Sequence, residues 1–341
     1  MHPTAIRDII VPGHEPILRG KVRDIFDLGE HLLLVTSDRI SAYDVVLPQG
    51  IPEKGAILTQ LTQWWLDRLP SEIRHHLVST QPADFPEPFR EAAEEWGPRA
   101  MLVKKLDMIP VECVVRGYVV GSGWKDYQAT GAICGIPLPE GMQQAERIDD
   151  PIFTPAAKNH DGHDENISIE KAGEMVGADL MHQLKSLSVD IFSHGREHAA
   201  TQGLILADTK FEFGMDADGP VLGDEVLTAD SSRYWPADEY KVGASPPSFD
   251  KQYVRDYLAS VGWTGEGSPP NLPAEVIEGT TARYQELFER VTGVAWETWK
   301  ARLPTWNVRL SDIRLGQLAW ETWKARPPTW ELRLSDVRIA N

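Results

Sequence analysis

The sequence has few cysteines, no long hydrophobic run and no leader-like start. Its two cysteines, Cys113 and Cys134, lack the spacing of a metal site, and a structural disulfide is unusual in a reducing compartment, so we expect both to be reduced. No run approaches the roughly 20 apolar residues that span a bilayer. The start MHPTAIRDII lacks the basic and apolar blocks of a signal peptide. These absences predict a cytoplasmic protein with no membrane partner.

Basic residues are scarce relative to acidic ones. The chain has 34 Lys and Arg against 51 Asp and Glu, which gives a formal net charge of −17. This balance argues against nucleic acid as a partner, because binding its backbone requires a broad basic surface. It leaves room for a local positive pocket that binds a phosphate or carboxylate, since close charges outweigh distant, screened ones.

Length and periodicity predict more than one lobe, built from strands and helices. At 341 residues the chain is longer than most single domains. We expect an antiparallel meander over 18–47, an amphipathic helix over 57–69 and two helical stretches over 169–202. Gly, Pro, Asp and His are frequent in 134–168, which predicts a long loop. A further helix is expected over 248–261, with the serine at its start as N-cap.

The C-terminal end contains a duplication. The segment AWETWKARLPTWNVRLSDIR at 295–314 recurs with small changes at 319–338, and the two copies hold six of the 12 tryptophans. Two copies are too few for a solenoid that is stable by itself. The duplication is either a basic appendage docked on the acidic body or a poorly ordered extension, and it indicates no function.

The stretch ILADTKFEFG, residues 205–214, reads as a strand with two different faces. Side chains alternate along a strand, so one face would carry Ala207, Thr209, Phe211 and Phe213. The other face would carry Asp208, Lys210 and Glu212. Taken alone, this second face is most simply a solvated surface with a salt bridge.

The next strand changes that interpretation. A hairpin would bring Asp224 and Glu225 back toward Glu212, and carboxylates on adjacent strands repel each other unless a positive group lies between them. Mg²⁺ would meet that need with one or two carboxylates, water and phosphate oxygens. Lys210 would then meet a phosphate. Arg233 offers a planar fork for a carboxylate or phosphate, although a surface ion pair is the simpler interpretation.

Two further clusters are suited to anions. In VVRGYVVGSGW, Arg116 ends an apolar strand, and the glycines around Ser122 offer backbone N–H groups at close range. In RGKVRDIF, Lys21 and Arg23 alternate on a strand. This falls short of a Walker motif and is closer to the hairpin that covers nucleotide phosphates in kinases. By itself it is a strand with two outward cations.

The segment 154–166 allows a transition-metal interpretation. Its potential zinc ligands are His160, Asp161, His163, Asp164 and Glu165. Their spacing matches no helix-based zinc site, and the Gly and Asn content indicates a loop. We favour a polar substrate loop in which Lys158 is the useful cation.

Six motifs, in this order, resemble the phosphoribosylaminoimidazole-succinocarboxamide synthase (SAICAR synthetase) family. They are GKVRDIF, SDRISAYDVVLPQGIPEKGAILTQL, KKLDMIPVECVVRGYVVGSGWKDY, PIFTPAAKNHDGHDENIS, ILADTKFEFG and GDEVLTADSSRYW. The resemblance covers roughly residues 15–293, and the insertions around 70–100 and 130–165 are similar to the longer, fungal-type branch. The tail after Gly293 has no counterpart in it.

The resemblance implies a two-lobed α+β fold related to ATP-grasp and kinase-like enzymes. An antiparallel, nucleotide-covering lobe would occupy 1–108, a larger catalytic lobe of mixed sheet and helix 109–293, and the Trp-rich basic extension 294–341. It also implies a reaction of de novo purine biosynthesis. ATP, carboxyaminoimidazole ribonucleotide (CAIR) and L-aspartate would give the succinocarboxamide SAICAR, ADP and phosphate through an acyl phosphate.

The resemblance also implies roles for the nucleotide-binding residues. Glu212 and Asp224 would hold Mg²⁺–ATP. Lys21 and Arg23 would cover the phosphates, and the segment from Lys104 to Glu112 would line the adenine and ribose.

For the other substrates, Arg116, Ser122 and Arg233 would bind the phosphate and carboxylate of CAIR. Asp208 and Lys210 would line the same pocket and, with Arg116, form the catalytic group. Further substrate-binding positions implied by the motifs are Ser41, Asp44 and Lys158.

Two alternatives remain open in the sequence. One is a related carboxylate–amine ligase with a different amine donor, and the other is a nucleotide-binding protein that has lost turnover. We expect a monomer or small homo-oligomer.

Overall fold

The computed structural model describes residues 4–158, 165–249 and 251–303. The chain divides into two compact units, Met1–Ala295 and Trp296–Asn341. In the second unit the described part contains helix α8 (Trp296–Arg302). Most of the predicted duplication, from residue 304 onward, lies outside the described residues.

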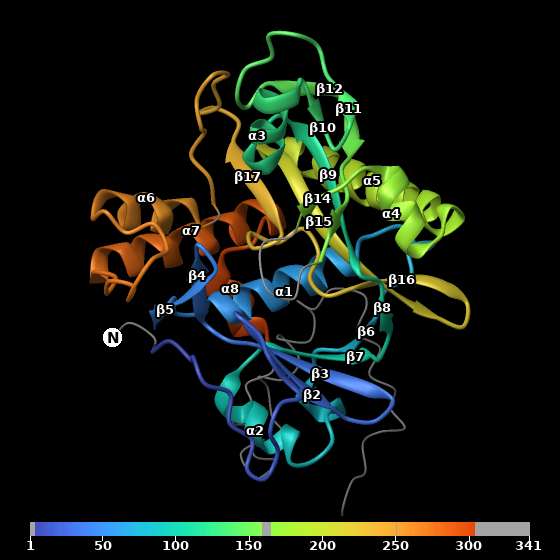
Figure 1. The fold of residues 1–341 in the computed structure, drawn as a ribbon. Helices are drawn as coiled ribbons and strands as arrows, with labels where there is room; N and C mark the ends of the chain where they lie inside the picture. Colours follow the sequence, from blue (N-terminus) through green and yellow to red (C-terminus); the bar gives the residue numbers. More distant parts are fainter. Residues whose placement is uncertain (1–3, 159–164, 250, 304–341) are drawn as a thin grey trace, which may run out of the picture. The chain divides into compact units, whose positions relative to one another are not determined.

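The N-terminal part of the first unit is a five-stranded antiparallel sheet in the order β1-β2-β3-β7-β6 (Figure 1). Its strands are β1 (Leu18–Arg19), β2 (Arg23–Asp27), β3 (His31–Thr36), β6 (Leu77–Ser79) and β7 (Ala100–Lys104). Phe26 and Leu33 of this sheet pack with Trp96 of α2 (Phe89–Trp96), beside the 3₁₀ turn η1 (Pro82–Asp84). The predicted meander therefore exists, but it ends at β3, because β4 (Arg39–Ala42) and β5 (Val45–Gly50) form a separate hairpin.

A larger antiparallel sheet of eight strands forms the rest of the framework. Its main path is β14-β13-β9-β15-β16, and β12, β17 and β8 pair with its central strands β9 and β15. The strands are β8 (Asp107–Met108), β9 (Val111–Tyr118), β12 (Arg147–Phe153), β13 (Ala156–Ala157), β14 (Glu165–Asn166), β15 (Leu204–Asp216), β16 (Gly219–Gly223) and β17 (Ser232–Pro236). The predicted hairpin is confirmed, since Glu212 of β15 is paired with Gly223 of β16.

The prediction of a long loop over 134–168 was wrong for its described part. The segment contains β12, β13 and β14 together with β11 (Ile136–Pro137), which pairs with β10 (Ala132–Ile133). β13 joins the edge of β9 through only two residues, β14 joins β13 through two, and β12 has a register shift between Arg147 and Ile152. Strands this short and irregular leave no hydrophobic period in a sequence rich in Gly, Pro and Asp.

Helix α1 (Lys54–Leu66) lies between the two sheets in Figure 1, in contact with β3, β7 and α7. The amphipathic helix predicted here therefore exists, but it begins and ends three residues earlier and is buried on all sides: every residue except Gln63 is buried. Contacts on opposite flanks remove the solvent face that an amphipathic stripe would have. The helix therefore has to place Lys54, at its first position, in the interior.

Five further helices lie in the described part of the first unit. They are α3 (Gly121–Thr130), α4 (Ile169–Val176), α5 (Ala178–Thr201), α6 (Gln252–Ser260) and α7 (Ala274–Thr292). The two predicted helical stretches over 169–202 are confirmed as α4 and α5, which are separated at Gly177. The predicted N-cap of α6 was wrong: the N-cap is Lys251, and Ser248 lies before the helix. No helix of the described ranges is long and apolar enough to cross a membrane.

The segment between β16 and β17 is strained and tightly packed. Asp224 and Leu227 both have φ of 53°, and the fully buried Leu227 packs against α5 at Gly195. A Cβ added at Gly195 would lie 2.7 Å from Cδ1 of Leu227, so only glycine fits without a shift. Tyr234 of β17 donates a hydrogen bond of 2.9 Å to the carbonyl oxygen of Leu227. Such over-determined packing holds a backbone that would otherwise relax.

Candidate active site

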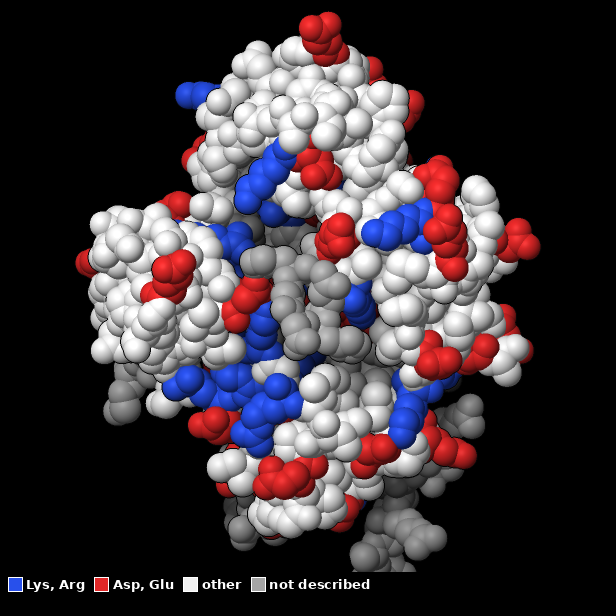
Figure 2. All heavy atoms as spheres, in the orientation of Figure 1, with Lys and Arg blue, Asp and Glu red and all other residues white. Residues whose placement is uncertain are grey.

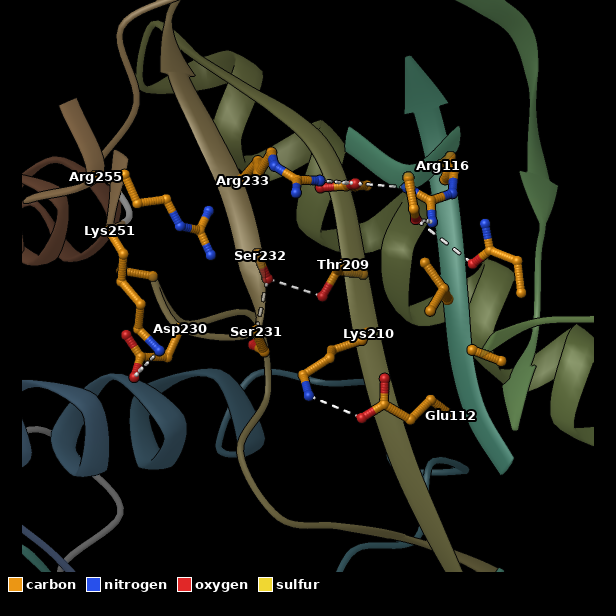
Figure 3. A pocket seen from close by; sticks show the side chains of 16 residues that line it. Glu112, Arg116, Thr209, Lys210, Asp230, Ser231, Ser232, Arg233, Lys251 and Arg255 are labelled. Carbon is orange, nitrogen blue, oxygen red and sulfur yellow. Dashed lines mark hydrogen bonds and ion pairs between the residues drawn. The ribbon is translucent and has the colours of Figure 1, made fainter. Parts of the chain in front are cut away.

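A cavity of about 240 Å³ opens on the face of β9, β15 and β17, beside α6 (Figure 3). Its basic lining residues are Arg116, Lys210, Arg233, Lys251 and Arg255. Its acidic lining residues are Glu112, Asp208 and Asp230. Figure 2 shows Lys and Arg side chains gathered around the middle of this face, with Asp and Glu side chains both among them and toward its edges. The positive pocket expected in an acidic chain is therefore present.

Strand register creates the first charged group, which we call the Asp208 cluster: Arg116, Asp208 and Arg233. Asp208 on β15 lies opposite Arg116 of β9 on one side and opposite Arg233 of β17 on the other. Its Oδ2 atom is 3.0 Å from Nη1 of Arg116 and also accepts a hydrogen bond from Nη1 of Arg233. Two guanidinium groups share one carboxylate, so these three side chains together carry a net charge of +1.

The glycine-rich turn after β9 makes room for these guanidinium groups. Gly121 has φ of +61°, and a Cβ on it would lie 2.7 Å from Nη2 of Arg233. A Cβ on Gly123 would lie 3.1 Å from Cδ of Arg116. Ser122, between them, accepts a hydrogen bond of 2.9 Å from Nη2 of Arg116. The glycines thus allow the arginines and Ser122 to converge, in addition to the anion contacts predicted for their backbone.

Lys210 lies on the same face of β15 and is bound by Glu112 of β9. Its Nζ atom is 2.8 Å from Oε1 of Glu112. Burial opposes the charge on Lys210, but the carboxylates of Glu112, Glu212 and Asp224 outweigh it and raise the pKa of the amine. Lys210 is therefore a fixed cation and is unsuited to act as a base.

A second group, which we call the Asp230 cluster, consists of Lys54, Asp230, Lys251 and Tyr284. Oδ2 of Asp230 is 2.7 Å from Nζ of Lys54 and 3.3 Å from Nζ of Lys251. Tyr284 donates a hydrogen bond of 2.7 Å to Oδ1. Burial opposes ionisation of Asp230, but Lys251 and Lys54 outweigh it and hold the pKa of the carboxyl below its usual value.

Sequence reasoning missed the whole Asp230 cluster and Arg255. The signals were weak but present. Lys54 stands at the start of a hydrophobic helix, and Asp230 stands beside Ser231 and Ser232 in the motif that contains Arg233. Lys251 and Arg255 are four residues apart, so α6 places them on one face.

The carboxylates predicted to hold a metal are each bound by a cation. Oε2 of Glu212 is 2.6 Å from Nζ of Lys158. Oδ1 of Asp224 is 2.5 Å from Nη1 of Arg23, whose Nη2 is 2.8 Å from Oε1 of Glu225. Within the described ranges no three or more His, Cys, Asp or Glu side chains are grouped to hold a metal ion.

The remaining predicted residues lie apart from the cavity lining. Lys21 forms an ion pair with Asp44 on the turn between β4 and β5. Ser41 is buried on β4, and Lys104 is exposed at the end of β7. Of the predicted zinc ligands, Glu165 is exposed in β14, and His160, Asp161, His163 and Asp164 lie outside the described residues.

Comparison with known proteins gives one consistent result. A model of the SAICAR synthetase family matches residues 16–271. The phosphoribosylaminoimidazole-succinocarboxamide synthase of Syntrophotalea carbinolica is 49% identical over 285 residues, which cover 83% of this chain and 96% of the relative. That of Methylobacillus flagellatus is 50% identical over 280 residues, 81% of this chain and 94% of the relative.

Solved structures agree with the sequence relatives. SAICAR synthase from Saccharomyces cerevisiae in complex with SAICAR superimposes with a TM-score of 0.78 at 41% identity, covering 86% of this chain and 99% of the yeast chain. A SAICAR synthetase in complex with ADP superimposes with a TM-score of 0.60 at 24% identity, covering 82% of this chain and 98% of that chain, and so shows the fold alone. The two-lobed α+β fold implied by the resemblance is confirmed.

Proposed function

The chain belongs to the SAICAR synthetase family, and we propose that it joins L-aspartate to the carboxylate of CAIR, forming SAICAR, ADP and phosphate from ATP. The observation that carries this proposal is the Asp208 cluster with Ser122 at the cavity. Its excess positive charge and paired forks suit a small substrate that carries both phosphate and carboxylate.

The reaction requires activation of the carboxylate, because its oxygen is a poor leaving group. Transfer of the γ-phosphoryl group of ATP to that oxygen would give an acyl phosphate and ADP. The aspartate amine would then attack the acyl carbon, the carbon–oxygen bond to phosphate would break, and the amine would lose its proton as the amide forms. Exclusion of water protects the acyl phosphate from hydrolysis.

In this reaction Arg116, Ser122 and Arg233 would bind the phosphate and carboxylate of CAIR. Asp208 would hold the two guanidinium planes in place through Oδ2, which contacts both. Lys210, kept protonated beside Glu112, would neutralise charge on the phosphoryl group during transfer. We propose Arg116, Asp208 and Lys210 as the catalytic group.

The nucleotide would lie toward the smaller sheet, where Lys21 and Arg23 would cover its phosphates. Lys104 and Glu112 would border the adenosine. Glu212 and Asp224 fit Mg²⁺ by donor type, since the ion takes one or two carboxylates and completes its shell with water and phosphate oxygens. Bound there, Mg²⁺ would neutralise the phosphate oxygens of ATP.

The carboxylates that such an ion would use form ion pairs with Lys158 and Arg23 in this structure. Binding of Mg²⁺–ATP would therefore exchange these ion pairs for contacts with phosphate, which both side chains can also make. Ser41 and Asp44 are proposed to contact the substrates. A cytoplasmic location and a monomer or small homo-oligomer stay predictions.

The proposal is tested by phosphate release from ATP with CAIR, Mg²⁺ and one of three amines: L-aspartate, L-glutamate or L-alanine. We expect release to require CAIR and to be at least about 10-fold slower with the other two amines than with aspartate. Equal release with all three, or release only with another amine, would favour a ligase with a different donor. ATP binding without CAIR-dependent hydrolysis would favour a protein that has lost turnover.

The metal role is tested in the same assay. Glu212→Ala should lower Mg²⁺-dependent turnover by about 10²-fold or more, the effect of removing one electrostatic catalytic group. Exposed Glu140 provides a matched control, and Glu140→Ala should retain wild-type turnover. Near-normal activity of Glu212→Ala would overturn its role.

A further inference from the structure

The cavity has a second positively charged end, which is distinct from the Asp208 cluster assigned to CAIR. In the Asp230 cluster one carboxylate is shared by two ammonium groups, Lys54 and Lys251. The side chain of Lys54 is 0% exposed and that of Lys251 is 17% exposed, so only Lys251 faces the cavity. This end also keeps an excess of one positive charge, which it can offer to a ligand.

Arg255 adds a further cation at the same end. It lies one helical turn after Lys251 on α6, and Figure 3 shows both side chains reaching into the cavity from that helix. It is half-buried, and within the described ranges its side chain has no ion pair or hydrogen bond. A half-buried guanidinium without an acceptor points to an acceptor brought by a ligand.

The proposed reaction leaves one charged substrate without a binding site. The Asp208 cluster is assigned to CAIR and Lys210 to the transferring phosphoryl group, whereas the amine donor brings two carboxylates of its own. Resting on that proposed function, we propose that Lys251 and Arg255 bind the carboxylates of the amine donor and select a dicarboxylic amino acid.

The chemistry of the two side chains explains the selection. Arg255 offers a fork that binds a carboxylate through two parallel hydrogen bonds, and Lys251 offers a point charge. A donor without the second carboxylate would leave one of these cations desolvated and unpaired. Alanine is therefore rejected for its missing charge. Glutamate is rejected because its longer side chain misplaces the amine, a smaller penalty.

The test is the steady-state kinetics of Arg255→Gln and Lys251→Met, with each substrate varied in turn. Each variant should raise KM for aspartate by about 10- to 100-fold, or about 1.4–2.8 kcal/mol, through the loss of one charge-assisted hydrogen-bond partner. KM for CAIR and ATP should stay within about twofold. Arg90→Gln, which removes an exposed arginine of α2 that pairs with Glu87, is the matched control and should behave as wild type.

A second measurement is inhibition of the reaction by a donor analogue that cannot itself react. Succinate has both carboxylates of the donor but no amine, so it should inhibit competitively against aspartate. Its inhibition constant should rise in Arg255→Gln in parallel with KM, and the preference for aspartate over alanine should fall about 10-fold or more.

Two results would overturn the proposal. One is an unchanged KM for aspartate in both variants, and the other is a rise in KM for CAIR in place of aspartate, which would assign this end to the ribonucleotide. If the wild-type chain itself releases no phosphate with CAIR and aspartate, the proposed function fails. Wild-type activity together with an unaffected Arg255→Gln variant would defeat this inference alone.

Discussion

Both ends of the cavity have an aspartate shared by two cations, but they differ in the further hydrogen bonds that hold these cations. Arg116 of the Asp208 cluster also donates hydrogen bonds to Thr154 Oγ1 at 3.0 Å and to Ser122 Oγ at 2.9 Å. Lys54 of the Asp230 cluster is 0% exposed, and Asp230 is the acceptor that holds its ammonium group. If the carboxylate of Asp208 is removed, Arg116 keeps two other hydrogen-bond acceptors. If the carboxylate of Asp230 is removed, Lys54 keeps no other hydrogen-bond acceptor among the described residues.

Because of this difference, we expect the Asp230 cluster to contribute more to the stability of the fold than the Asp208 cluster does. Lys54 comes from α1, Tyr284 from α7 and Asp230 from the segment before β17, so their contacts tie three elements together behind the cavity. The Asp208 cluster joins neighbouring strands that the sheet already pairs. The two clusters carry the same net charge, but loss of their aspartates should lower the free energy of unfolding by different amounts.

The largest expected effect is on unfolding. Asp230→Asn leaves the buried Lys54 ammonium without its carboxylate and should lower the free energy of unfolding by about 3–5 kcal/mol. Asp208→Asn, the matched change, should lower it by about 1–3 kcal/mol because Arg116 keeps its other acceptors. Urea denaturation of both variants measures the difference. Equal losses would contradict the distinction drawn between the two ends.

A smaller loss of stability is expected when the cation of the same ion pair is replaced. Lys54→Met leaves Asp230 with Lys251 and Tyr284, so the loss should be about 1.5–3 kcal/mol. Adding Lys54→Met to Asp230→Asn should then cost less than the sum of the two single changes, because the stranded ammonium is gone. A double-mutant cycle in urea tests this. Additive losses would show that the two residues act independently.

The smallest effect concerns binding at the Asp208 cluster. Arg116→Lys keeps the charge but loses the fork, so apparent affinity for CAIR should weaken by about 5- to 30-fold, or about 1–2 kcal/mol. KM for CAIR at saturating ATP and aspartate is the measurement, with KM for aspartate as the internal control. An unchanged KM for CAIR would remove Arg116 from the ribonucleotide site.

The sequence predicted the charged face of β15 better than the framework that holds it. Alternation along β15 was enough to place Asp208 and Lys210 together, because a strand has a fixed period and one face must be buried. Phe211 and Phe213 are indeed buried. The six ordered motifs supplied the family, which the comparisons confirm.

What the sequence could not give depends on contacts between distant residues. No local pattern shows that α1 is covered on opposite flanks, so Lys54 could not be distinguished from a lysine at an exposed helix start. The partner of Asp230 comes from 176 positions earlier. The ion pairs that occupy Glu212 and Asp224 arise in the same way, through Lys158 and Arg23.

The contact between Gly195 and Leu227 has a practical consequence for mapping variants. Gly195 is on a helix that touches no substrate in the proposed reaction, yet any side chain there would have to displace the buried side chain of Leu227. A survey that ranks positions by distance from the ligands would pass over it. We expect Gly195 to tolerate little change, and a defect there would be read as a failure of catalysis although its origin is packing.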